Sequence, residues 1–198
     1  YGIGEASLSG RSAAVAAAFE HLTPLLIGAD ASRIEHIWQD IYRGTFWRGG
    51  PVLQSALAGI DIALWDLAGK AAGKPVHELL GGPVKPDIPV YASALHPVGA
   101  EKVQAEAKAY VEEGYQAMKM RFPYGPGHGI DGMRANEEHV ANVRDAVGDD
   151  IEIMADAYMG WDFLYAKKMV KRLEPYRLAW LEEAFLPDDL NSYAKIRK

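Results

Sequence analysis

Four short apolar segments recur at regular intervals in the second half of the sequence, and they restrict the possible folds more than any other feature. They begin near residues 88, 115, 151 and 178 and read DIPVYASA, YQAMKMRF, IEIMADAYM and LAWLEEAF. Amphipathic helical stretches follow them at 99–113, 131–147, 161–174 and from about 188 to the end. This rhythm predicts four consecutive βα units and a parallel sheet, either an open doubly wound sheet or a barrel.

The two kinds of sheet make different demands on the sequence. No G-x-G-x-x-G motif follows the first predicted strand, which weakens the nucleotide-binding version of the open sheet. A complete barrel has eight strands and takes about 250 residues, so four units amount to half of one. Such a half barrel would leave a parallel edge without a neighbouring strand.

The first part of the sequence has a helical rhythm instead. Residues 11–80 are rich in alanine and leucine at helical spacing, and glycines together with Pro24, Pro51 and Pro75 break the pattern. The rhythm changes near residue 86. We therefore predict two domains, one over 1–85 and one over 86–198.

Composition excludes several classes of protein. The 198 residues are 49% hydrophobic and carry a net charge of −6, which is typical of a soluble globular protein. The absence of cysteine excludes disulfides and thiolate zinc sites and fits a cytoplasmic location. The uncharged apolar runs are far shorter than the roughly 18 residues of a membrane span, and no basic face is present for nucleic acid. We expect no membrane and no nucleic-acid partner.

Charged residues recur near the C-terminal ends of three successive predicted strands. Because side chains alternate along a strand, Lys119 and Arg121 share one face of AMKMRF, while its two methionines and its phenylalanine share the other. Asp156 and Glu182 occupy corresponding places in the next two strands. The C-terminal ends of parallel strands are where α/β proteins build their sites.

These residue types suit metal-assisted proton abstraction. Asp156 and Glu182 can converge on Mg²⁺, which prefers oxygen ligands and leaves positions open for water and substrate. A metal that binds a substrate carboxylate stabilises the charge formed when a proton leaves the α-carbon, and a nearby amine could accept that proton. Taken singly, Lys119 and Arg121 could be solvated or salt-bridged, and Asp156 could be a turn or capping residue. Their recurrence at three strand ends favours a site.

Several motifs resemble those of the mandelate racemase branch of the enolase superfamily, and within it the acid-sugar dehydratases. In chain order they are GIGEASL, SALAGIDIALWDLAGKAAGKPVHELLGG, IPVYAS, KMRF, ADAYMGWD and WLEEAFLPDD. The resemblance implies an α/β protein, with a TIM-type (β/α) barrel behind an α+β N-terminal capping domain. Residues 1–85 would be the C-terminal part of the capping domain, and 86–198 the first four βα units. It also implies a piece of a longer protein, truncated at both ends and inactive by itself.

The resemblance implies roles for individual residues. Lys119 and Arg121 match the two positions of the family's K-x-K motif and are the expected catalytic residues. Asp156 and Glu182 match two ligands of the family's Mg²⁺ cofactor. The third ligand and a His-Asp pair are expected on later strands outside this sequence. Arg121 departs from the usual lysine, and a guanidinium is a poor proton acceptor, which makes two-base racemisation less favourable.

Four further residues are candidates for substrate binding. Tyr158 stands where the family often has asparagine, and Tyr124 and His128 lie in the loop FPYGPGHGIDG after the Arg121 strand. A solvated glycine-rich loop is the simpler interpretation of that segment. Trp47, in RGTFWRGG, could close over the site from the capping domain, although packing also explains it.

The resemblance implies an Mg²⁺-dependent dehydratase of a sugar acid, either an aldonate or an aldarate. The expected reaction removes the α-proton of a metal-bound carboxylate and loses the β-hydroxyl from an enediolate to give a 2-keto-3-deoxy sugar acid. A homo-oligomer is expected for the full-length protein. An epimerase, racemase or cycloisomerase of the same branch stays open, as does a non-catalytic paralogue that binds metal and sugar acid. A phosphate-binding βα protein with a glycine-rich backbone nest is a third class.

Overall fold

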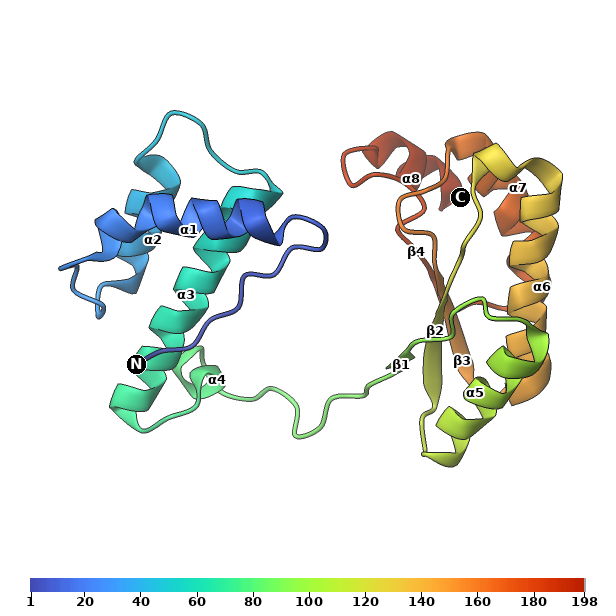
Figure 1. Cartoon of the computed structure of the whole chain (residues 1–198). Helices are drawn as coiled ribbons and strands as arrows, with labels where there is room; N and C mark the ends of the chain where they lie inside the picture. The colour runs from blue at the N-terminus through green and yellow to red at the C-terminus, as the bar shows by residue number, and fades with distance from the viewer. Residues whose placement is uncertain (198) are drawn as a thin grey trace. The chain divides into compact units, whose positions relative to one another are not determined.

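The computed structural model describes residues 1–197 and divides the chain into two compact units, residues 1–87 and the residues from Ile88 onwards (Figure 1). The first unit contains helices and the second alternates strands with helices.

Unit 1 is built around one long helix. Helix α3 (Pro51–Ala72) has a proline at its first position and ends at Gly73, whose left-handed backbone (φ 64°) suits a residue without a β-carbon. It packs against α1 (Ser12–Leu26) and α2 (Ile34–Arg43), and α4 (Val76–Leu79) follows it. The core of this unit consists of Val15, Leu22, Ile37, Ile41, Ala56, Leu57 and Ile60.

Two sequence expectations for unit 1 need correction. Pro24 does not break the helical pattern, because α1 continues through it to Leu26. A proline this close to the C-terminal end removes a single intrahelical hydrogen bond, which the helix tolerates. The resemblance implies an α+β capping domain, but residues 1–87, including the segment GIGEASL, form no strand in this structure.

Helix α3 is apolar on most of its surface. Its length and its mean hydropathy of 1.3 over an 18-residue window would allow it to cross a membrane. Core helices of soluble proteins meet the same criterion, and α3 packs against two other helices of its unit. We therefore interpret α3 as the core helix of unit 1.

Unit 2 contains the four predicted βα units. Its strands form a parallel sheet in the order β1-β2-β3-β4. The strands are β1 (Ala92–Ser93), β2 (Ala117–Arg121), β3 (Glu152–Asp156) and β4 (Leu181–Glu182). The helices are α5 (Ala100–Glu112), α6 (Gly129–Val147), α7 (Phe163–Leu173) and α8 (Leu190–Ile196), with short 3₁₀ turns at Pro126–His128 and Glu174–Tyr176. Strands β1 and β4 are shorter than predicted, since each pairs with a single neighbour among the described residues.

Helices α5, α6 and α7 cover the same face of this sheet (Figure 1). Met118 and Met120 of β2 and Ile153 of β3 point to that face and are fully buried. A doubly wound sheet would carry helices on both faces, whereas sequential strand order with helices on one face is the arrangement of a barrel wall. The opposite face carries the charged residues at the strand ends.

Candidate active site at the ends of strands β2, β3 and β4

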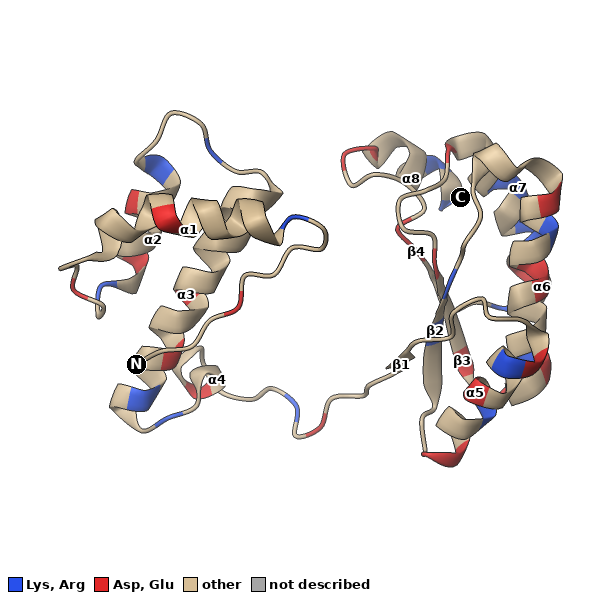
Figure 2. Ribbon diagram, viewed as in Figure 1, with Lys and Arg blue, Asp and Glu red and all other residues tan. Residues whose placement is uncertain are grey.

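The strand register brings four charged side chains together. Arg121 of β2 pairs with Asp156 of β3, and Asp156 pairs with Glu182 of β4. Lys119 lies two residues earlier on the same face of β2. Figure 2 shows basic residues on β2 beside acidic residues on β4. All four predicted charged residues therefore gather at the C-terminal edge of the sheet, on the face away from the helices.

Lys119 lies between the two carboxylates. Its Nζ donates a hydrogen bond to Glu182 Oε1 at 2.5 Å and lies 3.5 Å from Asp156 Oδ2. The lysine is 6% exposed and Asp156 is 4% exposed. Burial by itself lowers the pKa of Lys119, but the hydrogen bond and charge of Glu182 and the charge of Asp156 outweigh it, so the pKa is raised. In this arrangement Lys119 is a protonated counter-ion of both carboxylates.

Other groups fix the two carboxylates. Asp156 Oδ1 accepts a hydrogen bond from the backbone N–H of Tyr158 at 2.9 Å. Glu182 Oε2 accepts one from Trp180 Nε1 at 3.1 Å. Burial raises the pKa of Glu182, yet the hydrogen bonds from Lys119 and Trp180 together with the Lys119 charge lower it overall. Both carboxylates are thus held in the orientation that faces the Lys119 ammonium.

Arg121 has a different environment from Lys119. Within residues 1–197 no carboxylate lies within ion-pair distance of its guanidinium. Its Nε is buried and has no hydrogen-bond partner among the described residues. The guanidinium carbon lies 5.5 Å from the centre of the Tyr158 ring, a cation–π distance. Arg121 is therefore the cation of this site that is available to an anionic ligand.

The backbone is strained where β3 and β4 end. Tyr158 (φ 51°), Met159 (φ 56°) and Glu183 (φ 47°) have left-handed conformations although none is glycine. Met159 N–H donates to the carbonyl of Glu183 at 2.5 Å, which ties these two strained turns together. Each such residue costs of order 1 kcal/mol, and strain of this kind clusters at functional sites. Here it occurs within three residues of both carboxylates.

The carboxylates of Asp156 and Glu182 could supply two of the ligands of a divalent cation. Within residues 1–197 no cluster of three or more His, Cys, Asp or Glu side chains is placed to hold a metal. Asp156 and Glu182 do converge on one cation, the Lys119 ammonium. Two hard oxygen donors around a position that already favours positive charge are compatible with Mg²⁺, which commonly uses one or two protein carboxylates and completes its shell with water and substrate.

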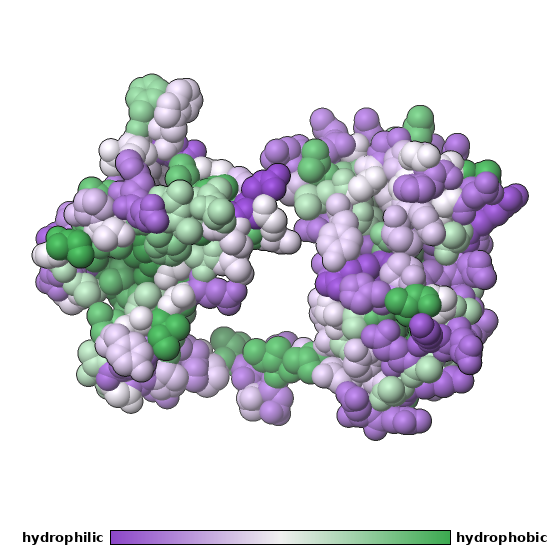
Figure 3. All heavy atoms as spheres, in the orientation of Figure 1, coloured by the Kyte–Doolittle hydropathy of each residue, from purple (hydrophilic) through white to green (hydrophobic). Residues whose placement is uncertain are grey.

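The four residues predicted to bind substrate lie in two separate places. Tyr158, Tyr124 and His128 border a cavity of about 430 Å³ between the loops that follow β2 and β3. Trp47 belongs to unit 1, where it projects with Phe46 from the loop between α2 and α3, and Figure 3 shows side chains standing clear of that unit there.

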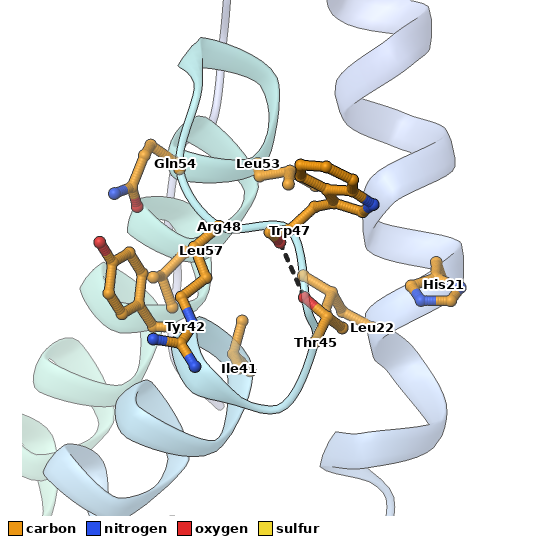
Figure 4. A pocket seen from close by; sticks show the side chains of 11 residues that line it. His21, Leu22, Ile41, Tyr42, Thr45, Trp47, Arg48, Leu53, Gln54 and Leu57 are labelled. Carbon is orange, nitrogen blue, oxygen red and sulfur yellow. Dashed lines mark hydrogen bonds between the residues drawn. The ribbon is translucent and has the colours of Figure 1, made fainter.

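Trp47 also borders a cavity of its own unit, of about 220 Å³ (Figure 4). His21, Tyr42 and Arg48 lie around the same cavity, whose walls are mainly apolar. Among the described residues no Asp or Glu lines it, so it differs in chemistry from the site at the strand ends. A role for Trp47 in substrate binding stays a prediction.

Sequence reasoning missed three neighbours of the site. The Tyr91 ring centre lies 5.8 Å from Lys119 Nζ, and Ser93 pairs with Lys119 across β1 and β2. Trp180 donates to Glu182 and stacks edge-on against Tyr91 with ring centres 5.7 Å apart. The alternation argument used for AMKMRF, applied to IPVYAS, would have placed Tyr91 and Ser93 on the same face.

Family models match both units of the chain. Residues 1–81 match the mandelate racemase / muconate lactonizing enzyme N-terminal domain, and residues 102–198 match the enolase C-terminal domain-like family. Among curated relatives, a D-mannonate dehydratase of Caulobacter sp. (strain K31) is 37% identical over 100% of this chain and 55% of its own length. A D-galactonate dehydratase of Pectobacterium atrosepticum is 41% identical over 98% of this chain and 51% of its own length. The chain spans about half the length of the curated relatives it matches.

Solved structures show the same relationship. An enolase from Pantoea ananatis with bound D-gluconate and Mg superimposes with a TM-score of 0.86 at 32% identity, covering 100% of this chain and 56% of that one. The 3,6-anhydro-D-galactonate cycloisomerase from Zobellia galactanivorans gives 0.88 at 32% identity, covering 100% and 53%. These likenesses confirm the predicted fold class, an α/β barrel of which about half is present. The chain belongs to the mandelate racemase / muconate lactonizing enzyme group of the enolase superfamily.

Proposed function

We propose that the protein is an Mg²⁺-dependent dehydratase of a sugar acid. The observation that carries the proposal is the convergence of Asp156 and Glu182 on one cationic position, with Arg121 beside them and in no ion pair within residues 1–197. The names of the relatives support it, because several are dehydratases of D-mannonate or D-galactonate. A related structure holds D-gluconate and Mg, which supports the same substrate class and metal.

Asp156 and Glu182 are the residues of this chain that would hold Mg²⁺. When bound, the ion would bind the substrate carboxylate and stabilise the second negative charge that forms when the α-proton leaves. The predicted third ligand stays outside this sequence. Both carboxylates now face the Lys119 ammonium, so Lys119 would have to leave them before they could hold Mg²⁺.

The two cations of β2 have different tasks in this proposal. Arg121 holds the negatively charged end of the substrate, since a guanidinium pairs well with carboxylates and is a poor proton acceptor. Lys119, released from Glu182, is the candidate base of this chain. The base takes the α-proton, and the C–H electron pair moves toward the carboxylate. That electron pair then forms the C=C bond and expels the β-hydroxyl, which takes a proton from the protonated base and leaves as water. The resulting enol rearranges to a 2-keto-3-deoxy acid.

A cycloisomerase is the second candidate, because one of the similar structures carries that activity in its name. It would share the proton abstraction and differ in the group that leaves or adds at the β-carbon. A non-catalytic paralogue would keep the two carboxylates without a working base. The proposal includes a cytoplasmic location, which the lack of cysteine supports.

The test is hydrogen exchange and product formation by the protein expressed from its complete gene. A panel of aldonates and aldarates is incubated in D₂O with and without Mg²⁺. We expect deuterium at the α-carbon and a 2-keto-3-deoxy acid from at least one substrate, only with Mg²⁺. Asp156→Asn should lower the rate by about 10²-fold or more, as expected when a metal site loses a ligand charge.

The matched control is Asp150→Asn, which makes the same change at an exposed carboxylate outside the site. It should behave as the wild type. Exchange without a keto product would favour an epimerase, and isomerisation without loss of water a cycloisomerase. No exchange with any acid sugar, together with unchanged Mg²⁺ affinity in Asp156→Asn, would contradict the enzyme proposal.

A further inference from the structure

The loop after β2 is held rigidly at one backbone atom, the carbonyl oxygen of Tyr124. Trp161 Nε1 donates a hydrogen bond to it at 2.9 Å, and Asn136 Nδ2 donates another at 2.9 Å. Asn136 is fully buried in α6, and Trp161 is 6% exposed in the loop after β3. Two buried donors from two different elements thus fix one point of a segment that the sequence portrays as a solvated glycine-rich loop.

Packing around this point leaves the loop little room to move. The Trp161 ring stacks on Phe122 with centres 5.1 Å apart and planes 27° apart. A β-carbon on Gly125 would lie 2.7 Å from the carbonyl oxygen of Gly160, so the loops after β2 and β3 touch there. A β-carbon on Gly132 would lie 2.5 Å from the β-carbon of His128. The two glycines allow a close fit that a larger residue would disrupt.

Asn136 makes these bonds at a cost. Its Nδ2 donates to Tyr124 O and, at 3.3 Å, to the hydroxyl of Tyr165, but its Oδ1 is buried without a partner among the described residues. An unpaired buried carbonyl destabilises a protein, and an apolar side chain of the same shape would avoid that. Fold stability alone therefore does not explain an amide at this position, whereas a need to place the Tyr124 carbonyl does.

The fixed loop borders the site. Its cavity of about 430 Å³ is lined by Phe122, Tyr124, His128, Tyr158, Gly160 and Trp161. Tyr158, which lines this cavity, also lies 5.5 Å from the Arg121 guanidinium carbon, so the cavity adjoins the charged group at the strand ends through the Tyr158 ring. Aromatic rings with hydroxyl and imidazole groups suit a ligand that presents C–H faces and hydroxyls, such as the open chain of a sugar acid.

We propose that the loop 122–129 is a fixed wall that recognises the hydroxyl-bearing tail of the acid sugar, and that Asn136 and Trp161 are positioning residues that hold it through the Tyr124 carbonyl. This inference rests on the proposed function, because the tail binds here only if the carboxylate end binds at Arg121 and the metal. The wall would set which chain lengths are accepted, while the groups on β2, β3 and β4 perform the chemistry.

The test compares kcat and KM for two substrates in the protein expressed from its complete gene. One is a six-carbon aldonate and the other a four-carbon acid sugar without the distal hydroxyls. Trp161→Phe removes the N–H and keeps a ring against Phe122. Asn136→Leu combined with Tyr165→Phe removes the amide and its second partner together, so that no buried hydroxyl loses its bond. Tyr165→Phe alone is the control, since both donors to Tyr124 remain.

We expect KM for the six-carbon substrate to rise about five- to tenfold in both test variants, the size expected for a lost hydrogen bond. Its kcat and the KM for the four-carbon acid should stay within about twofold of wild type, and the control should match wild type. Unchanged KM in both folded variants would overturn the inference, as would equal weakening of both substrates. An inactive wild type would instead overturn the proposed function before any variant is compared.

Discussion

Replacing Lys119 with methionine removes the ammonium that lies between Asp156 and Glu182. A pair that is fully buried loses about 3–5 kcal/mol when one partner is removed, while exposed pairs contribute about 0–1 kcal/mol. Lys119 and Asp156 are buried, but the Glu182 side chain is 31% exposed. We therefore expect an intermediate loss of about 2 kcal/mol in unfolding free energy without Mg²⁺. For a unit of this size that lowers the melting temperature by roughly 6–10 °C.

Mg²⁺ should reverse the effect. In Lys119→Met no ammonium competes for the carboxylates, so the ion should bind more tightly and raise the melting temperature more than in the wild type. The assay is thermal unfolding at neutral pH with and without millimolar Mg²⁺. The stability difference between the wild type and Lys119→Met should shrink as the pH falls through the lowered pKa of Glu182. The Lys119–Glu182 ion pair contributes fully only above the ordinary glutamate pKa of 4.5 and is lost when Glu182 is protonated.

Arg121→Met is the matched control, since it removes a cation two residues away on the same strand and the same face. Arg121 has no ion pair among the described residues, so its loss should cost clearly less stability than that of Lys119. Equal destabilisation by both changes, or a Lys119→Met protein that melts like the wild type and gains nothing extra from Mg²⁺, would refute the reasoning.

Two further predictions concern the buried His139 and the half-buried Arg144, both outside the site. Burial lowers the pKa of His139 despite its contact with the Leu95 carbonyl, so the unfolded chain takes up a proton first as pH falls below about 6.5. Unfolding free energy should therefore decline below that pH in urea titrations, and His139→Gln should flatten the decline; an identical decline in the variant would contradict this. Arg144 donates to the carbonyls of Tyr176, Gly148 and Ile151 at 2.7–3.1 Å, so Arg144→Lys, whose single ammonium cannot reach all three, should lose about 2–3 kcal/mol. Wild-type urea stability in Arg144→Lys would show that these bonds contribute little.

The positions of the charged residues could be predicted because they depend on local geometry. Alternation along AMKMRF separates Lys119 and Arg121 from Met118 and Met120, and the structure buries both methionines under helices. The same rule aligns Asp156 with Glu182, because parallel strands put their C-terminal ends at one edge. The two-residue alternation of side chains and the parallel order of the strands were therefore sufficient to predict which charged residues share a face and an edge of the sheet.

Contacts that join distant segments could not be predicted. The sequence gives no sign that Lys119 bridges two carboxylates, since this depends on the register of three strands and on side-chain length. The two hydrogen bonds to the Tyr124 carbonyl come from Asn136 in α6, which follows β2, and from Trp161 in the loop that follows β3. The glycine-rich composition predicted a solvated loop, and most of this segment is exposed, yet Gly125 and Gly132 also permit a close fit that composition did not indicate. Glycine content shows which backbone conformations a loop can adopt, whereas contacts with other segments determine which conformation it has.

The contrast between the two cations of β2 links the fold to the proposed chemistry. Lys119 neutralises the carboxylates when they hold no metal, which reduces the repulsion that two like charges in one site would otherwise cause. Arg121, on the same face but two residues closer to the C-terminal end of β2, has a buried Nε without a hydrogen-bond partner in the described part of the chain, and its guanidinium lies at a cation–π distance from Tyr158. The unpaired donor is a cost to the folded chain that an anionic ligand would remove. We therefore propose that Lys119 stabilises the site while it holds no metal and acts as the base once released, and that Arg121 recognises the substrate.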